Sequence, residues 1–95
     1  MAETTADFRD LSSHALALHQ QGRLAEAEQL YIEIIRKNPT IVGPRYMLGV
    51  MRLQQGRVQE AVELMAPSAR VNPDDVATQM NYAMALRGAG RLSEA

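Results

Sequence analysis

The chain has 95 residues, of which 46% are hydrophobic, and its 10 basic and 11 acidic side chains leave a formal net charge of -1. This near-balance argues against a nucleic acid as the partner, because phosphate binding needs clustered Lys and Arg. The chain has no cysteine, which excludes disulfides, thiolate zinc sites and a cysteine nucleophile.

The N-terminal segment, residues 1–10, carries Glu3, Asp7 and Asp10 and lacks the apolar stretch of a signal peptide. The longest nearly apolar run, residues 46–51, is far shorter than the roughly 20 residues that cross a bilayer. We therefore predict a cytoplasmic protein that does not contact a membrane.

Apolar residues recur at helical spacing along the chain, and strand alternation is not seen. Leu11, Ala15 and Leu18 form the first such stripe. The second and fourth stripes consist of Leu24, Ala27, Tyr31, Ile34 and Ile35 and of Val58, Ala61, Val62, Met65 and Ala69. The pattern predicts an all-α chain with helices at residues 6–21, 24–37, 41–55, 58–71 and 74–88, and the start of a sixth helix after Arg91.

Glycine and proline mark the ends of these helices. Gly22, Gly56 and Gly90 each follow a predicted helix, where a left-handed residue allows a tight turn. Pro39 and Pro73 stop the second helix of each pair. Thr40 and Asp74 come next in the sequence, and we expect them to cap the helices that follow.

Pro67 lies inside the predicted helix 58–71. A proline within a helix removes one hydrogen bond to the carbonyl four residues earlier and crowds that turn. We therefore expect a kink or bulge near Pro67, with the Glu63 carbonyl lacking its usual backbone partner.

Two markers recur at intervals of 34 residues. The string Gly-Arg-x-x-Glu-Ala begins at Gly22, Gly56 and Gly90, and Asn-Pro occurs at residues 38–39 and 72–73. A helix-turn-helix unit of this length and pattern resembles the tetratricopeptide repeat. The matching residues are Ala15, Gly22, Ala27, Tyr31 and Pro39; Leu48, Gly49, Gly56, Ala61 and Pro73; and Ala83, Gly90 and Ala95.

The resemblance implies antiparallel helix pairs stacked as a right-handed α-solenoid. It divides the chain into a lead-in at 1–7, repeats at 8–41 and 42–75, and a truncated third repeat at 76–95. Two aromatic positions of the family are replaced, by Leu11, Arg45 and Gln79 and by Leu18, Arg52 and Leu86. Arg45 and Arg52 share a helix face, where we expect them to pair with Glu60 or Glu63; an anion contact is the alternative.

No combination of residues predicts catalysis. Asp10, Ser12, Ser13, His14 and His19 are close in sequence, but His14 and His19 lie about 140° apart around a helix and cannot share a metal ion. We predict no catalytic, metal or cofactor site, with His14 at a helix contact and His19 on the surface.

The resemblance implies instead that the first helix of each pair lines a concave groove that binds a protein or peptide, as in a scaffold or adaptor. The groove residues would be Arg9, Ser12, Leu16, His19, Tyr46, Val50, Leu53, Gln54, Met80, Asn81, Met84 and Arg87. Of these, Leu16, Tyr46, Val50, Leu53, Met80 and Met84 would form an apolar floor.

Two specialised branches of the family match poorly. A branch that clamps the terminal carboxylate of a peptide would use the positions that hold Ser12, Leu16, Met47, Ala77 and Asn81, and only Asn81 fits. O-linked N-acetylglucosamine transferases carry an asparagine ladder, here Ser13, Met47 and Asn81. Only Asn81 matches this ladder, and it leaves one alternative function, in which the chain is the substrate-docking arm of such an enzyme.

Ala95 falls in the first turn of the sixth predicted helix, so we expect the chain to be the N-terminal piece of a longer protein. The fifth-helix face carrying Tyr82, Ala83 and Leu86 would then be left without cover. Because exposed apolar surface favours association, we expect a homodimer through the C-terminal end.

Overall fold

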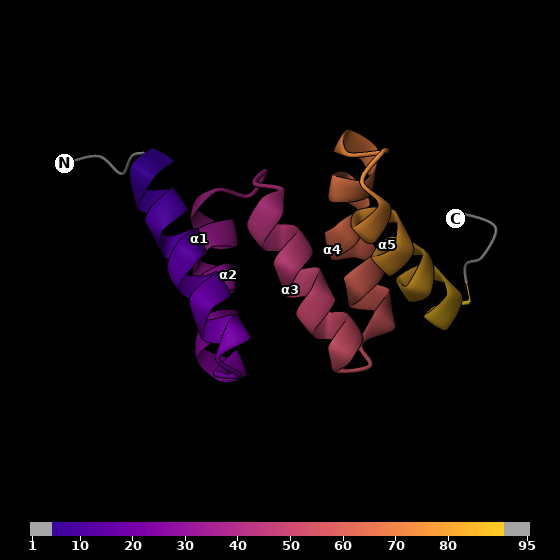
Figure 1. The fold of residues 1–95 in the computed structure, drawn as a ribbon, viewed down its shortest axis with the longest axis horizontal. Coiled ribbons are helices and arrows are strands. Elements are labelled where there is room, and N and C mark those ends of the chain that lie inside the picture. Colours follow the sequence, from indigo (N-terminus) through magenta and orange to yellow (C-terminus); the bar gives the residue numbers. More distant parts are fainter. Residues whose placement is uncertain (1–4, 91–95) are drawn as a thin grey trace. The chain divides into compact units, whose positions relative to one another are not determined.

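The computed structural model describes residues 5–90, with side chains from Asp10 onward (Figure 1). It contains the helices α1 (Thr5–Gln20), α2 (Leu24–Lys37), α3 (Gly43–Gln54), α4 (Val58–Val71) and α5 (Val76–Gly88). Residues 5–90 contain no strand, and every helix end lies within two residues of its predicted position. The prediction of an all-α helical repeat is confirmed, while the predicted start of a sixth helix lies outside the described residues.

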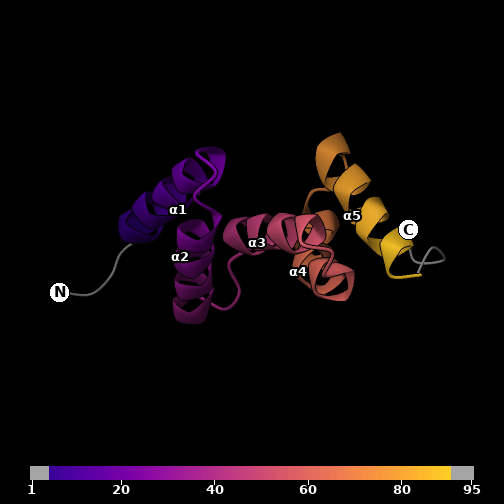
Figure 2. The same ribbon diagram turned by 90° about the horizontal axis from the view of Figure 1, so that it is seen from below.

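The chain forms two compact units that meet at the bond between Pro44 and Arg45. In the first unit, α1 packs against α2, and in the second, α4 packs against α5 (Figures 1 and 2). The second unit also holds α3 from Arg45 onward. Both helix pairs are joined by short connections, as antiparallel helix hairpins are.

The three marker glycines adopt the predicted left-handed conformation, with φ of 81°, 79° and 75° at Gly22, Gly56 and Gly90. At the end of α1, the Gly22 N–H donates to the His19 carbonyl at 3.0 Å and the Arg23 N–H donates to the Leu18 carbonyl at 2.9 Å. This bonding pattern closes a helix with a left-handed residue. The glycine therefore recurs because the turn requires a positive φ.

The arginine and glutamate of the repeated string form a local ion pair. The Nε and Nη2 atoms of Arg23 donate to the two carboxylate oxygens of Glu26, at 2.6 and 2.8 Å. Arg57 donates to both carboxylate oxygens of Glu60 in the same way, at 2.8 and 2.9 Å. Exposed pairs contribute only about 0–1 kcal/mol. The same ion pair forms in both repeats, which accounts for the constant spacing of three residues between the arginine and the glutamate of the repeated string.

The interior of the first unit comes from both of its helices. Ala15 and Leu18 on α1 are buried, as are Ala27, Tyr31 and Ile34 on α2. The side chain of Ala27 is fully buried, and its small size suits the contact between the two helices.

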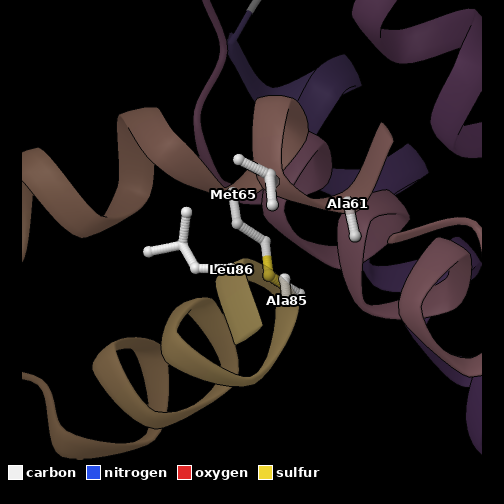
Figure 3. Packing of buried hydrophobic residues seen from close by; sticks show 5 residues of the cluster. Ala61, Met65, Ala85 and Leu86 are labelled. Atoms are coloured by element: carbon white, nitrogen blue, oxygen red, sulfur yellow. The ribbon is translucent and has the colours of Figure 1, made fainter. Parts of the chain in front are cut away.

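The interior of the second unit joins α4 to α5. Ala61, Val62 and Met65 form one cluster with Ala85 and Leu86 (Figure 3). Leu86 is 0% exposed, so the prediction that it lies on an uncovered face is wrong. Leu86 points toward α4, which already covers it.

The predicted helix caps are also wrong. Thr40 lies three residues before α3, and its hydroxyl contacts the Asn38 side-chain oxygen at 3.4 Å instead. The cap of α5 is Asp75, whose carboxylate accepts hydrogen bonds from the N–H of Thr78 at 3.0 Å and from its hydroxyl. A turn closed by the Asp75 N–H on the Asn72 carbonyl moves the cap one residue along the chain, from Asp74 to Asp75.

Pro67 lies within α4, which is helical from Val58 to Val71. Because proline has no N–H, it cannot donate to the Glu63 carbonyl. The helix resumes its bonding beyond this point, where the Asn72 N–H donates to the Ser68 carbonyl at 2.9 Å. A kink at Pro67 stays a prediction.

Gly49 on α3 lies close against α4. A Cβ atom on Gly49 would lie 2.8 Å from Met65 Cγ and 3.1 Å from Leu64 Cβ. Overpacking costs about 1–3 kcal/mol, which we expect to exceed the roughly 1 kcal/mol that alanine gains over glycine in a helix. Gly49→Ala should therefore lower the melting temperature. Gly88→Ala is the control, because the three atoms nearest to its added Cβ all belong to the Val58 side chain and lie at 3.0 Å or more. An equal loss of melting temperature in the two variants would contradict the predicted overpacking at Gly49.

The Asp75 cap should make α5 sensitive to acid. The side-chain and backbone hydrogen bonds from Thr78 lower the pKa of the Asp75 carboxyl, so its contribution to stability is present above the unfolded pKa and is lost as pH falls through the lower folded pKa. Asp75→Ala should lower the melting temperature at pH 7, with a smaller difference near pH 2, as followed by circular dichroism. Asp74→Ala removes an exposed carboxylate that does not cap α5, so it should lower the melting temperature at pH 7 by less than Asp75→Ala does.

Candidate functional site

The residues predicted to line a groove fall in both units. In the first unit, Ser12 is half-buried and Leu16 is 40% exposed. Arg9 lies in α1, and its side chain is outside the described residues. The other predicted groove residues lie in the second unit, apart from His19.

His19 packs inside the first unit. Its ring meets the ring of Tyr31 edge-on, with centroids 6.3 Å apart and an interplanar angle of 78°. His19 is half-buried and His14 is exposed, so the predicted environments of the two histidines are reversed. His19 lies on the side of α1 that faces Tyr31 of α2, while His14 lies on a side that is exposed.

Two polar atoms of this aromatic pair are buried without a hydrogen-bond partner among the described residues. They are His19 Nδ1 and Tyr31 Oη. Burial raises the pKa of the Tyr31 hydroxyl, because desolvation disfavours the phenolate. The pair is therefore a packing feature that retains unused hydrogen-bonding capacity.

In the second unit, α3 and α5 are linked by a hydrogen bond. The side-chain amide of Asn81 donates to the Tyr46 hydroxyl at 2.7 Å. Tyr46, Val50 and Leu53 are half-buried and pack against the α4–α5 cluster. These three predicted floor residues thus contribute to the interior as well as to the surface.

Three of the exposed large apolar residues in this region belong to α5. Val76, Met80 and Met84 are 69%, 60% and 49% exposed, and we call them the α5 stripe. The fourth, Val71 at the end of α4, is 60% exposed. Gln54 and Arg87 are exposed as well. Val76 was not among the predicted groove residues, although its spacing of four residues from Met80 could have identified it.

Arg52 is the buried charge of the second unit, at 6% exposure. Its Nε lies 3.4 Å from Glu60 Oε1 as an ion pair, and its Nη1 donates to Gln55 Oε1 at 3.0 Å. The expected pairing of Arg52 with Glu60 is confirmed.

A hollow of about 270 Å³ opens beside this ion pair. It is lined by Arg45, Leu48, Arg52, Glu60, Glu63 and Leu64. Two acidic side chains offset the two basic ones, so the hollow lacks the excess positive charge that an anion site needs.

Among the residues from Asp10 to Gly90, no group of three or more His, Cys, Asp or Glu side chains is placed to hold a metal ion. None of the described helices is long and apolar enough to cross a membrane.

The unpaired Tyr31 hydroxyl should cost stability. Tyr31→Phe removes a buried polar group without a partner, so the free energy of unfolding at pH 7 should stay equal or rise by about 1 kcal/mol. Because burial raises the pKa of Tyr31 in the folded chain, the free energy of unfolding falls as pH rises above the unfolded value of about 10 and through the higher folded pKa. The variant should lack this part of the alkaline decline. Urea unfolding from pH 7 to 11 would measure both effects.

Tyr46→Phe is the matched control, because it removes a hydroxyl that accepts a hydrogen bond from Asn81. It should lower the free energy of unfolding by about 0.5–1.5 kcal/mol. If both variants changed the free energy of unfolding by the same amount, the Tyr31 hydroxyl would not be an unpaired buried group.

Comparison with known proteins agrees with the repeat geometry. Two family models described as tetratricopeptide repeat match the chain, one over residues 46–95 and the other over residues 10–32. No curated protein matches the chain. The first match covers more than half of the sequence, and it coincides with the second unit, in which Gly56 turns α3 into α4 and α5 packs on α4. The chain belongs to the tetratricopeptide-repeat family.

Proposed function

We propose that this chain is a binding module that holds a peptide or a helix of a partner protein, in the role of a scaffold or adaptor. Tetratricopeptide repeats are in general protein-interaction modules. The observation that carries the proposal is the exposure of Met80 and Met84 beside the hydrogen-bonded pair Tyr46 and Asn81.

The residues of this surface suit the recognition of a peptide. Methionine is unbranched and adapts its shape to varied ligands, and tyrosine offers a large contact area that loses little conformational freedom. The bond between Asn81 and Tyr46 holds α5 against α3, so the surface is ordered before a ligand arrives. Preorganisation lowers the cost of binding.

Polar groups at the edges of this surface would fix the orientation of a ligand. Gln54 on α3 and Arg87 on α5 are both exposed. A peptide that places an apolar side chain on Met84 could also pair a carboxylate with Arg87. We therefore favour a partner segment that combines apolar anchors with an acidic residue.

The alternative role, a substrate-docking arm of a larger enzyme, has weaker support. It relies on Asn81 as one rung of an asparagine ladder, and the amide nitrogen of Asn81 already donates to Tyr46. Repeats of this family are typically non-catalytic, so we propose that this chain contributes binding and no chemistry. A cytoplasmic location stays a prediction from the sequence.

Alanine substitution on α5 should weaken partner binding. Peptides selected from a random displayed library against the whole protein provide a probe, and titration calorimetry with the best peptide measures its affinity. Met84→Ala should weaken binding by about 1–2 kcal/mol, as truncation of an interface anchor does. Gln59→Ala on α4 and Glu33→Ala on α2 should leave the affinity unchanged, and equal effects at all three positions would refute the assignment.

A further inference from the structure

Helix α5 is apolar on two opposite faces. One face carries Ala85 and Leu86, which are buried against α4. On the other side lie Val76, Met80 and Met84, all of them about half exposed or more. At 100° per residue these three fall within an arc of about 80°. A helix with two apolar faces is typical of one that is covered on both sides.

The α5 stripe is symmetric about its central residue. Val76 and Met84 each lie four residues from Met80, on either side of it. In an antiparallel pair of identical helices, Met80 would therefore face Met80 of the second copy, and each Val76 would face a Met84. Such self-complementary contact defines a two-fold symmetric interface.

Opposite charges lie at nearly equal distances along the chain on either side of Met80, six residues before it and seven after it. Asp74 precedes the helix, and Arg87 lies in its last turn, about 20° around the axis from Val76 and thus on the same side as the stripe. In the antiparallel pair, Asp74 of each copy would lie near Arg87 of the other. This orientation also brings opposite ends of the two helix dipoles together.

We propose that two copies of this chain associate through antiparallel contact of their α5 stripes. The agreement of apolar spacing, charge and dipole with one symmetry operation favours a second copy over an unrelated occupant. The proposed face differs from the one predicted from the sequence, because Leu86 is buried and the stripe is exposed.

The proposal needs only α5, so it does not depend on the proposed function. It has a consequence for that function, because Met80, Met84 and Arg87 would be covered in the dimer. Self-association and partner binding would then compete for one surface. The contact is small, so we expect a weak dimer with a dissociation constant on the order of 0.1 mM.

Paired charge reversals test the proposal on the full chain. Arg87→Glu alone and Asp74→Arg alone each place like charges opposite one another in a symmetric pair, so each variant should self-associate at least about 10-fold more weakly than the natural chain. An equimolar mixture of the two variants restores both opposite-charge contacts. The mixture should therefore associate about as well as the natural chain in sedimentation equilibrium from about 10 µM to 2 mM.

Controls separate this contact from general effects of charge and folding. Arg70→Glu changes an exposed charge of α4 and should leave self-association unchanged, while Met80→Lys should abolish it by placing two charges at the symmetry axis. Circular dichroism should show the same helix content in all variants. Loss of helix in a reversal variant that the mixture does not restore would count against the proposal.

Two results would overturn the inference. One is a natural chain that stays monomeric at 2 mM, and the other is a mixture no better associated than its components. If a selected peptide still bound the monomer and Met84→Ala weakened it, the proposed function would stand while the dimer failed. If the mixture associated but the peptide ignored Met84, the dimer would stand and the proposed function would fail.

Discussion

The second unit depends on the burial of Met65 between the helices that flank α4. Its side chain is fully buried, and it contacts the place on α3 where Gly49 leaves room, since a Cβ there would lie 2.8 Å from Met65 Cγ. On the other side it belongs to the cluster with Ala85 and Leu86 (Figure 3). One flexible side chain therefore joins three helices. A close-packed interior transmits small changes in volume, so the position of α5 depends on this contact.

The position of α5 in turn determines the candidate binding surface. Because α4 buries Ala85 and Leu86, helical phase directs Met80 and Met84 outward. The bond from Asn81 to Tyr46 fixes the remaining rotation of α5 against α3. The apolar exposure of this helix is thus a consequence of its packing, and it leaves the same residues available to a partner peptide or to a second copy.

Charge plays a mainly local part in this chain. Arg23 with Glu26 and Arg57 with Glu60 close the same short turn, and exposed pairs of this kind add little stability. Arg52 differs, because it is buried and shares Glu60 with Arg57. Removing Glu60 would take an ion-pair partner away from a buried charge, which costs more than the loss of a surface pair.

The sequence by itself determined the features that depend on local geometry. Gly22, Gly56 and Gly90 mark turns that need a positive φ, and the spacing of apolar residues predicted all five described helices. These features depend on backbone sterics and on residues a few positions apart, which one repeat already contains.

Only the tertiary structure decided which face of each helix is covered. It exposed His14 and turned His19 onto Tyr31, it buried Leu86 under α4, and it left Val76 in the open. It also moved the cap of α5 from Asp74 to Asp75, because the turn after Pro73 uses one more residue. Apolar residues on both sides of a helix satisfy the same periodicity, so the choice between them depends on the neighbour against which the helix packs.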